Sequence, residues 1–113
     1  MRQGSFDLTA EVRVRYAPSP TGQPHIGNIR TALFNWFFAR HHKGALILRI
    51  EDTDRERNTP EAIKSLFECM EWLGLDFDEE AFYQSSQREN HLTIAQKLID
   101  SKNAYRHVKG DDG

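Results

Sequence analysis

A short segment with almost no polar residues, residues 45–50, most constrains the fold of this chain. Its sequence is ALILRI, in which Arg49 is the one charged residue. A continuous apolar run of this length suits a strand that is covered on both faces, as strands of parallel sheets are. Because parallel neighbours are joined by a crossover connection, the run also predicts a helix between this strand and its partner.

The residues before this run supply both the partner strand and the crossover helix. In residues 11–17 two valines and a tyrosine alternate with arginines, which is the period of a strand. The segment PSPTG, residues 18–22, breaks any strand ladder. From Pro24 to about His42 apolar residues recur at helical spacing, and Gly44 is placed to end that helix. The apolar positions of this predicted helix are Ile26, Ile29, Leu33, Trp36 and Phe37.

Two further helices are predicted downstream. Thr59, Pro60 and Gly74 stand where a cap, a first-turn residue and a helix terminator are expected. Ser86 and Glu89 have the spacing of a capping box, which predicts the start of a third helix. The predicted core face of that third helix consists of Leu92, Ala95, Leu98 and Ile99.

The predicted element order is β-α-β-α-α-β, with a loop over residues 75–84 and the third strand over residues 104–108. Strands that alternate with helices indicate an α/β fold with a parallel sheet and right-handed crossovers. Three strands make about the first half of a Rossmann-like, doubly wound parallel sheet. We expect one domain over residues 11–108, a flexible N-terminal extension over residues 1–10 and a frayed tail over residues 109–113.

Composition excludes several functional classes. The 113 residues include 15 Lys or Arg and 17 Asp or Glu, a formal net charge of −2. A protein that coats nucleic acid through general positive charge is therefore not expected, although a local basic patch is compatible with this balance. The single cysteine, Cys69, forms neither an intrachain disulfide nor a cysteine-rich zinc site, which favours a reducing, intracellular setting. The longest apolar stretches fall far short of the ~20 residues that span a membrane.

Two polar loops follow the first two predicted strands, at residues 17–25 and 51–57. Ligands of open parallel sheets bind beyond the carboxyl ends of the strands, and one crossover helix joins these two strands, so we expect the loops to be neighbours. His25 and Gly27 stand at the start of the helix, where free backbone N–H groups suit a phosphate. Neither of the two commonest phosphate-binding loop motifs is present. The alternative is a capping histidine and a packing glycine, the simpler interpretation for these two residues taken alone.

Charged residues beside these loops indicate how a substrate could be held. Arg15 ends a strand that is expected to be buried, and a buried arginine needs a partner. That partner is either Glu51, in an internal salt bridge that is the simpler expectation, or the carboxylate of a ligand. Glu51, Asp52 and Asp54 suit an amine, a ribose or a metal-bound phosphate. The alternative is a solvated acidic turn balanced by Arg55 and Arg57. Ser19 is either a ligand contact or an ordinary turn residue.

The aromatic residues of the first predicted helix are interpreted as core rather than as a stacking platform. Cys69 lies among apolar residues of the second predicted helix and is expected to be buried and inert. The aromatic residues in question are Phe34, Trp36, Phe37 and Phe38.

Six segments of the sequence, taken together, indicate a protein family far more specifically than any one of them does. They are RYAPSPTG (15–22), HIGN (25–28), RTALFNW (30–36), LRIEDTD (48–54), WLGLD (72–76) and YQS (83–85). This combination resembles the start of bacterial-type glutamyl-tRNA synthetases, which are class I aminoacyl-tRNA synthetases. The segment from Pro18 to Asn28 is similar to the first class I signature, the HIGH region, with Asn28 in place of the final histidine.

The resemblance implies a two-step, ATP-dependent ligation of L-glutamate to tRNA(Glu). The α-carboxylate of glutamate attacks the α-phosphate of ATP to give a glutamyl-adenylate and pyrophosphate, and the glutamyl group then moves to the terminal adenosine of the tRNA. ATP would arrive as its Mg²⁺ complex, with no metal bound by the protein itself. The implied setting is the cytoplasm of a bacterium, or an organellar matrix, with no membrane partner.

The resemblance also assigns roles by motif position. Glutamate would be held by Arg15, Ala17, Ser19 and Glu51. His25 and Gly27 would hold ATP, and these two residues with Asn28 form the catalytic signature. Asp54 would lie near the acceptor end of the tRNA.

Parts of the family pattern do not occur in the sequence. No lysine-containing KMSKS-type loop, which is the second signature, is found, nor are the tRNA-binding insertion and the anticodon-binding domain. We therefore expect a piece of a synthetase, whose partner is the remainder of the synthetase chain and which is inactive alone.

Several rival functions remain open. Glutamyl-queuosine tRNA(Asp) synthetase would share the glutamate and ATP sites, but its members usually carry Ser-Gly where Thr21 and Gly22 stand and an aliphatic residue at Thr53. Glutaminyl-tRNA synthetase fits the first loop and the following helix less well. A small nucleotidyltransferase with an H-x-G-H signature would not explain residues 48–54. A non-catalytic nucleotide-binding fragment is the remaining alternative.

Overall fold

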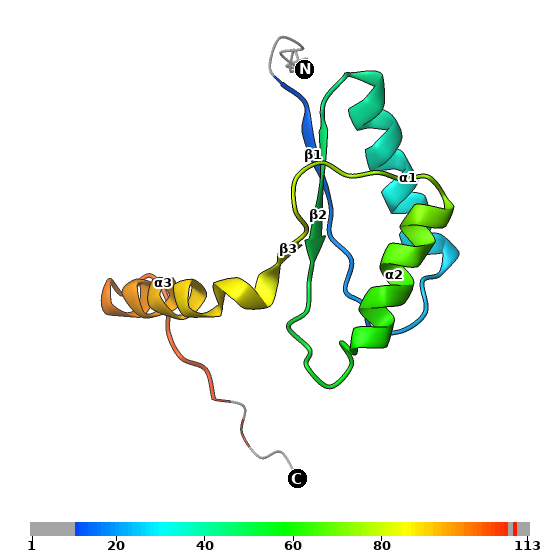
Figure 1. The fold of residues 1–113 in the computed structure, drawn as a ribbon. Helices are drawn as coiled ribbons and strands as arrows, with labels where there is room; N and C mark the ends of the chain where they lie inside the picture. Colours follow the sequence, from blue (N-terminus) through cyan, green and yellow to red (C-terminus); the bar gives the residue numbers. More distant parts are fainter. Residues whose placement is uncertain (1–10, 109, 111–113) are drawn as a thin grey trace.

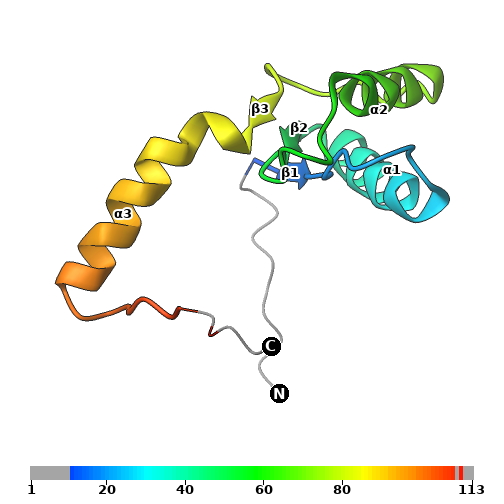
Figure 2. The ribbon, with the colours of Figure 1, turned by 90° about the horizontal axis from the view of Figure 1, so that it is seen from below.

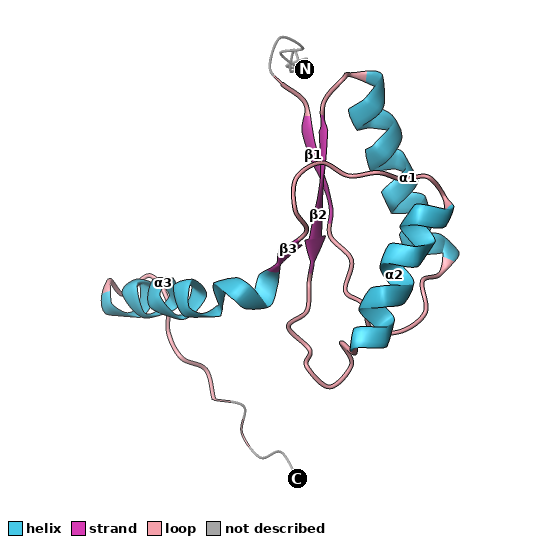
Figure 3. Cartoon of the chain, in the orientation of Figure 1, coloured by secondary structure: helices cyan, strands magenta, loops and turns pink. Residues whose placement is uncertain are grey.

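The computed structural model describes residues 11–108 and 110 and shows an α/β chain with a parallel sheet (Figures 1 and 3). The α/β class predicted from the alternation of strand and helix patterns is confirmed. The predicted extension over residues 1–10 and most of the predicted tail over residues 109–113 lie outside the described residues. The elements in chain order are β1 (Arg13–Tyr16), α1 (Ile26–His41), β2 (Ala45–Ile50), α2 (Pro60–Trp72), β3 (Phe82–Tyr83), the 3-10 helix η1 (Gln84–Gln87) and α3 (Arg88–Asp100).

The described strands form a sheet of order β1-β2-β3, in which each pair is parallel. β1 pairs with β2 in a register that sets Arg15 opposite Ile47, and β3 pairs with the end of β2 through Ile50 and Tyr83. The prediction of a third strand over residues 104–108 is wrong, because that segment has no strand in the structure. β3 instead lies inside the segment interpreted as a loop, and its two residues are too few to show a strand period.

α1 and α2 cover the same face of the sheet, while α3 projects away on the other side (Figures 1 and 2). The covered face carries Leu46, Leu48 and Ile50 of β2, all of which are fully buried. The three residues that alternate with them, Ala45, Ile47 and Arg49, are on the opposite face and are half-buried. The described residues therefore cover one face of β2 fully, whereas the apolar run predicted cover on both. The rest of the core consists of Tyr16, Ala32, Ala39, Ala62, Leu66, Met70 and Leu75.

α1 packs on the sheet through small side chains, because Ala32 and Ala39 are its buried residues. Alanine lets the helix approach the strands closely, and of the bulky residues of the apolar pattern Ile26 and Phe37 are exposed, whereas Ile29 and Leu33 are half-buried. Trp36 is half-buried and packs against the core, as predicted. The interpretation of the other aromatic residues as core is wrong within the described chain. The large exposed side chains of α1 are Ile26, Phe34, Phe37 and Phe38.

Gly44 is needed for a close approach between backbones rather than as the helix terminator. α1 ends at His41, and Lys43, with φ of 53°, supplies the left-handed residue. A Cβ atom at Gly44 would lie 2.1 Å from the carbonyl oxygen of Val12. The same carbonyl accepts a hydrogen bond from the amide of Ala45 at 2.8 Å, so the end of the crossover is held tightly against β1.

The predicted ends of α2 are confirmed. The Thr59 Oγ1 accepts a hydrogen bond from the amide of Ala62 at 3.2 Å, and Pro60 is the first helical residue. Gly74 follows the helix with φ of 70°, a conformation that favours glycine. Cys69 is half-buried rather than buried.

The start and the packing of α3 differ from the prediction. Ser86 makes no cap, because its hydroxyl donates to the carbonyl oxygen of Tyr83 at 2.6 Å. The N-cap is Gln87, which makes no side-chain capping bond. The helix has no buried residue, and of its predicted core face only Ile99 is half-buried. The helical periodicity therefore predicted the helix correctly, but the prediction that its apolar face is buried is wrong among the described residues.

Ion pairs and hydrogen bonds hold the segment between α2 and β3 to the start of β1 and to α1. Arg13 donates two hydrogen bonds to Glu79, at 2.6 and 2.9 Å. The indole of Trp36 donates to Asp76 at 2.8 Å, and this bond, followed by the charge of Arg40, lowers the pKa of the Asp76 carboxyl. Arg40 also pairs with Asp78 at 2.9 Å. In the part of the chain that the structure describes, no helix is long and apolar enough to cross a bilayer.

Candidate functional site

The loops that follow β1 and β2 lie against each other, as the parallel topology predicts. The two strands are direct neighbours in the sheet. Beyond the paired residues, the amide of Glu51 donates a hydrogen bond to the carbonyl oxygen of Pro18 at 2.9 Å. The first residue after β2 is thereby fixed to the turn that follows β1, and the prediction that these loops are neighbours is confirmed.

A depression of about 440 Å³ opens where the first loop enters α1. Four of the predicted site residues, Ala17, Ser19, His25 and Asn28, line it. Thr31 was not among the predicted site residues, although its spacing of three from Asn28 puts both on one side of a helix. The other lining residues are Tyr16, Pro18, Thr21 and Thr31.

His25 is the N-cap of α1. Its Nδ1 accepts a hydrogen bond from the amide of Gly27 at 3.2 Å, so the alternative of a capping histidine is confirmed. A ring nitrogen that accepts a hydrogen bond carries no proton, so the neutral imidazole holds its proton on Nε2. The cap therefore leaves one N–H donor on the ring for a ligand.

Gly27 has a packing role beside this histidine. A Cβ atom at residue 27 would lie 3.1 Å from Cε1 and 3.2 Å from Nδ1 of His25. A side chain here would press on the imidazole that caps the helix. The glycine thus preserves the ring position, which is the packing alternative considered from sequence.

The predicted internal salt bridge between Arg15 and Glu51 is wrong. Arg15 is exposed, on the side of β1 opposite the buried Tyr16. Among the described residues Arg15 forms no ion pair within 4.0 Å, and the cation nearest to Glu51 is Arg49, whose Nε lies 3.9 Å from Oε1. The strand was expected to bury Arg15, but β1 has one covered face, and the arginines occupy the other. The Arg15 guanidinium is therefore available to a ligand.

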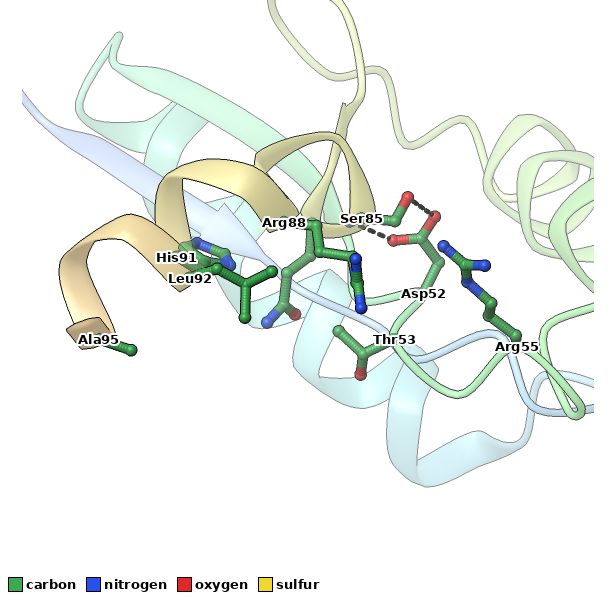
Figure 4. A pocket seen from close by; sticks show the side chains of 9 residues that line it. Asp52, Thr53, Arg55, Ser85, Arg88, His91, Leu92 and Ala95 are labelled. Carbon is green, nitrogen blue, oxygen red and sulfur yellow. Dashed lines mark hydrogen bonds between the residues drawn. The ribbon is translucent and has the colours of Figure 1, made fainter. Parts of the chain in front are cut away.

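Asp52 and Asp54 have structural partners of their own. Both carboxylate oxygens of Asp52 accept hydrogen bonds from Ser85, from its amide at 2.8 Å and its hydroxyl at 2.5 Å (Figure 4). Asp54 accepts from the amide of Arg57 at 3.3 Å, and the side-chain amide of Asn58 donates to its carbonyl oxygen. The balanced acidic turn is confirmed for Asp54, whereas Asp52 links the second loop to η1.

Burial changes the pKa of one side chain beside the depression, that of Tyr16. Burial raises the pKa of the Tyr16 hydroxyl, which lies at the end of β1 where the depression begins. Tyr16 is therefore a neutral side chain at neutral pH. Within residues 11–108 and 110, no group of three or more His, Cys, Asp or Glu residues is arranged to hold a metal ion.

Comparison with known proteins gives a consistent family match. Residues 11–112 match the family described as tRNA synthetases class I (E and Q), catalytic domain. A glutamate–tRNA ligase of Thermodesulfovibrio yellowstonii is 61% identical over 95 residues, which cover 84% of this chain and 20% of the relative. Glutamate–tRNA ligase 1 of Caldanaerobacter subterraneus subsp. tengcongensis is 53% identical over 98 residues, which cover 87% of this chain and 20% of the relative.

Solved structures give the same result. A glutamate tRNA ligase from Elizabethkingia meningosepticum, in complex with its amino acid, superposes with a TM-score of 0.73 at 39% identity. Glutamate-tRNA synthetase from Elizabethkingia anophelis superposes with a TM-score of 0.74 at the same identity. Each comparison covers 80% of this chain and 20% of the solved chain. The chain thus spans about a fifth of the length of the relatives that it matches.

Proposed function

The chain belongs to the family of class I tRNA synthetases (E and Q), catalytic domain, and we propose that it acts as part of a glutamate–tRNA ligase. The proposed reaction is the ATP-dependent ligation of L-glutamate to tRNA(Glu) through a glutamyl-adenylate. The observation that carries this proposal is the junction of the two loops, in which Glu51 is hydrogen-bonded to Pro18 beside the depression at the start of α1. The remainder of a synthetase chain is the partner proposed to supply the KMSKS-type loop.

Glutamate is proposed to bind between the ends of β1 and β2. Arg15 presents a guanidinium with no ion pair among the described residues, and it suits the side-chain carboxylate of the substrate. The α-carboxylate is then left to attack ATP. Glu51 suits the substrate's ammonium group, and Ala17 and Ser19 line the adjoining depression. The small side chain of Ala17 leaves room there, and the Ser19 hydroxyl offers a hydrogen bond.

ATP is proposed to bind at the start of α1. The Nε2–H of His25 is positioned by the cap to donate to a phosphate oxygen, and Gly27 keeps the ring in place. Asn28 lines the same depression and adds a neutral amide. Such donors stabilise the charge that develops on the phosphate as pyrophosphate leaves. Mg²⁺ is proposed to enter with ATP, bound through the phosphates, and supplies charge neutralisation there.

Asp54 is proposed to lie near the acceptor end of the tRNA. Its carboxylate already accepts a hydrogen bond from the amide of Arg57 and lies 3.8 Å from the Nε of that arginine. The enzyme is proposed to act in the cytoplasm.

Thr21 and Thr53 favour tRNA(Glu) as the substrate over the modified tRNA(Asp) of the paralogous enzyme.

Calorimetric titration of the 113-residue chain tests the proposal. L-Glutamate and ATP should each bind, and L-glutamine at the same concentration should give no heat beyond dilution. The Arg15→Gln variant should lose the glutamate signal and keep the ATP signal. Binding of ATP with no response to glutamate would instead favour a nucleotidyltransferase or a non-catalytic nucleotide-binding fragment.

A further inference from the structure

A second cavity lies where α2 ends, apart from the depression described above. It measures about 430 Å³, which is within the range of small-ligand pockets. We call it the α2 cavity. α2 begins beside the loop after β2 and runs back along the sheet, so the cavity and the proposed substrate site lie at opposite ends of this helix (Figure 1). The apolar residues that line the cavity are Phe67, Met70, Leu75 and Phe77.

The apolar walls of the α2 cavity rest on the core. Met70 and Leu75 are buried, and Phe67 and Phe77 are partly buried and pack against the core. The ring centroids of the two phenylalanines lie 6.1 Å apart, in a tilted arrangement. Because the core already holds these side chains, filling the cavity with an aromatic or aliphatic side chain requires little further ordering of the chain.

The rim of the α2 cavity carries negative charge. Glu71 and Asp76 belong to the lining, and no Lys, Arg or His is found among the described residues that form it. Asp76 is engaged by the indole of Trp36 at 2.8 Å and by Arg40 at 3.2 Å. Glu71 is exposed and has no ion pair within 4.0 Å among residues 11–108 and 110. The last turn of α2 also lacks a basic residue, although a helix C-terminus favours cations, so this end of the helix attracts a cation from outside the described chain.

Trp72 extends this surface beyond the cavity. Its side chain is 84% exposed and follows Glu71 in the last turn of α2. Glu68 lies one turn before both, and its exposed pair with Lys64, at 3.5 Å, contributes little in water. An exposed indole beside carboxylates suits a lysine or arginine side chain, and tryptophan is enriched among the residues that dominate binding energy. A surface of this extent suits a peptide better than a small molecule, and its charge disfavours nucleic acids and anionic membranes.

We propose that the α2 cavity docks a basic peptide segment of a partner protein. One aromatic or aliphatic side chain of the segment enters the cavity, and flanking lysines or arginines contact Glu71 and the face of Trp72. Complementary charge selects such a partner over an acidic one. The inference does not rest on the proposed function, because the docking surface shares no residue with the depression that is proposed to hold substrates.

The test is an NMR titration of the 113-residue chain with the capped peptide KKFKK, in which a phenylalanine stands between two pairs of lysines. The expected result is a saturable shift of the amides of Phe67, Gly74 and Phe77 and of the Trp72 indole. Glu71→Gln and Trp72→Ala should each weaken binding about threefold. Both side chains are exposed, so the two variants should fold as the unaltered chain does. Glu61→Gln, in the first turn of α2, is the matched control and should leave the affinity unchanged.

Two control peptides test the cavity and the charge separately. KKGKK lacks the apolar side chain and should bind about tenfold more weakly. EEFEE keeps the phenylalanine but reverses the charge, so it should give no saturable shift. Binding of KKGKK as tight as that of KKFKK, or saturable binding of EEFEE, would overturn the inference.

The absence of a saturable shift with KKFKK at millimolar concentration would also overturn it. Unchanged affinity in Glu71→Gln and Trp72→Ala, or equal weakening by Glu61→Gln, would show general electrostatic attraction and have the same consequence.

Other occupants of the α2 cavity give results of their own, and each of these results would overturn the inference. Binding of phenethylamine as tight as that of KKFKK would show a small-ligand site. Shifts of the same amides on raising the concentration of the chain alone would show that a second copy occupies the cavity. Loss of the peptide shifts when the remainder of a synthetase chain is supplied would show that this remainder covers it.

Discussion

Asp78 and Leu46 exchange two hydrogen bonds, although Asp78 belongs to no strand. The amide of Asp78 donates to the carbonyl oxygen of Leu46 at 2.8 Å, and the amide of Leu46 donates to Oδ2 of Asp78 at 2.8 Å. The same Oδ2 accepts from Arg40 at 2.9 Å. The loop before β3 therefore continues the hydrogen bonding of β2, with a carboxylate replacing a backbone carbonyl.

Stability should fall with acid because of this carboxylate. The Leu46 amide, and then Arg40, lower the pKa of the Asp78 carboxyl below its ordinary value of 3.8. A lowered folded-state pKa gives stability that is present above the ordinary value and is lost as pH falls through the folded value. We expect the urea midpoint to be constant near neutrality and to drop below about pH 4. Asp78→Asn should be less stable at pH 7 by about 1–2 kcal/mol and should show a shallower acid drop.

Glu68→Gln is the control for the Asp78 experiment. Glu68 lies 3.5 Å from Lys64 in an exposed pair on α2, so its removal should change stability by less than about 0.5 kcal/mol. An unchanged acid profile in Asp78→Asn would show that the pairing with Leu46 does not couple folding to pH.

Gly44→Ala should destabilise the fold strongly. Its new methyl would meet the Val12 carbonyl at 2.1 Å, and neither backbone segment can move without breaking the bond from Ala45 to Val12. We expect a loss of at least about 2 kcal/mol in urea unfolding. Gly22→Ala is the matched control, because nothing lies within 4 Å of the added atom, and its cost should stay within about 0.5 kcal/mol. Similar losses in both variants would refute the close approach.

His25→Asn separates capping from ligand binding. Asparagine is a good N-cap, so the variant should keep its stability within about 0.5 kcal/mol. It lacks the Nε2–H donor, so ATP-induced shifts of the Asn28 and Thr31 amides should be lost in NMR titration. His25→Ala should lose both the cap, at about 1 kcal/mol, and the shifts. Unchanged ATP shifts in His25→Asn would remove His25 from the proposed ATP site.

The 113-residue chain alone should show little or no ATP–pyrophosphate exchange with glutamate and tRNA. The sequence holds no KMSKS-type lysine to neutralise pyrophosphate. Each missing transition-state contact costs on the order of 3 kcal/mol, or ~100-fold in rate. The exchange of labelled pyrophosphate into ATP measures this directly, and robust turnover would refute the prediction.

Much of the fold was predictable because it depends on local signals. The alternation in β1, the apolar run of β2 and the cap at Thr59 each identify an element from a few residues. Parallel pairing of the first two strands then brings their loops together without further information. β3 escaped prediction because its two residues are too few to show a strand period, and its pairing with β2 joins residues that are distant in sequence.

Burial was the less predictable property. Helical spacing identifies a stripe, but it does not show which neighbours cover it, and Phe34 and Leu92 remain exposed. The expectation for Arg15 failed for a related reason, since β1 has one covered face rather than two. The link between Asp52 and Ser85 joins residues 33 apart in sequence, and no local pattern predicts such a contact.

The most direct test of the account is an NMR titration of the chain with L-glutamate, comparing Arg15→Gln with Arg13→Gln. The two arginines lie on the same side of β1, but Arg13 is already paired with Glu79. The account predicts glutamate-dependent shifts at Ala17, Ser19 and Glu51 that persist in Arg13→Gln and vanish in Arg15→Gln. Shifts that persist in Arg15→Gln, or that appear only at residues distant from these two loops, would contradict it.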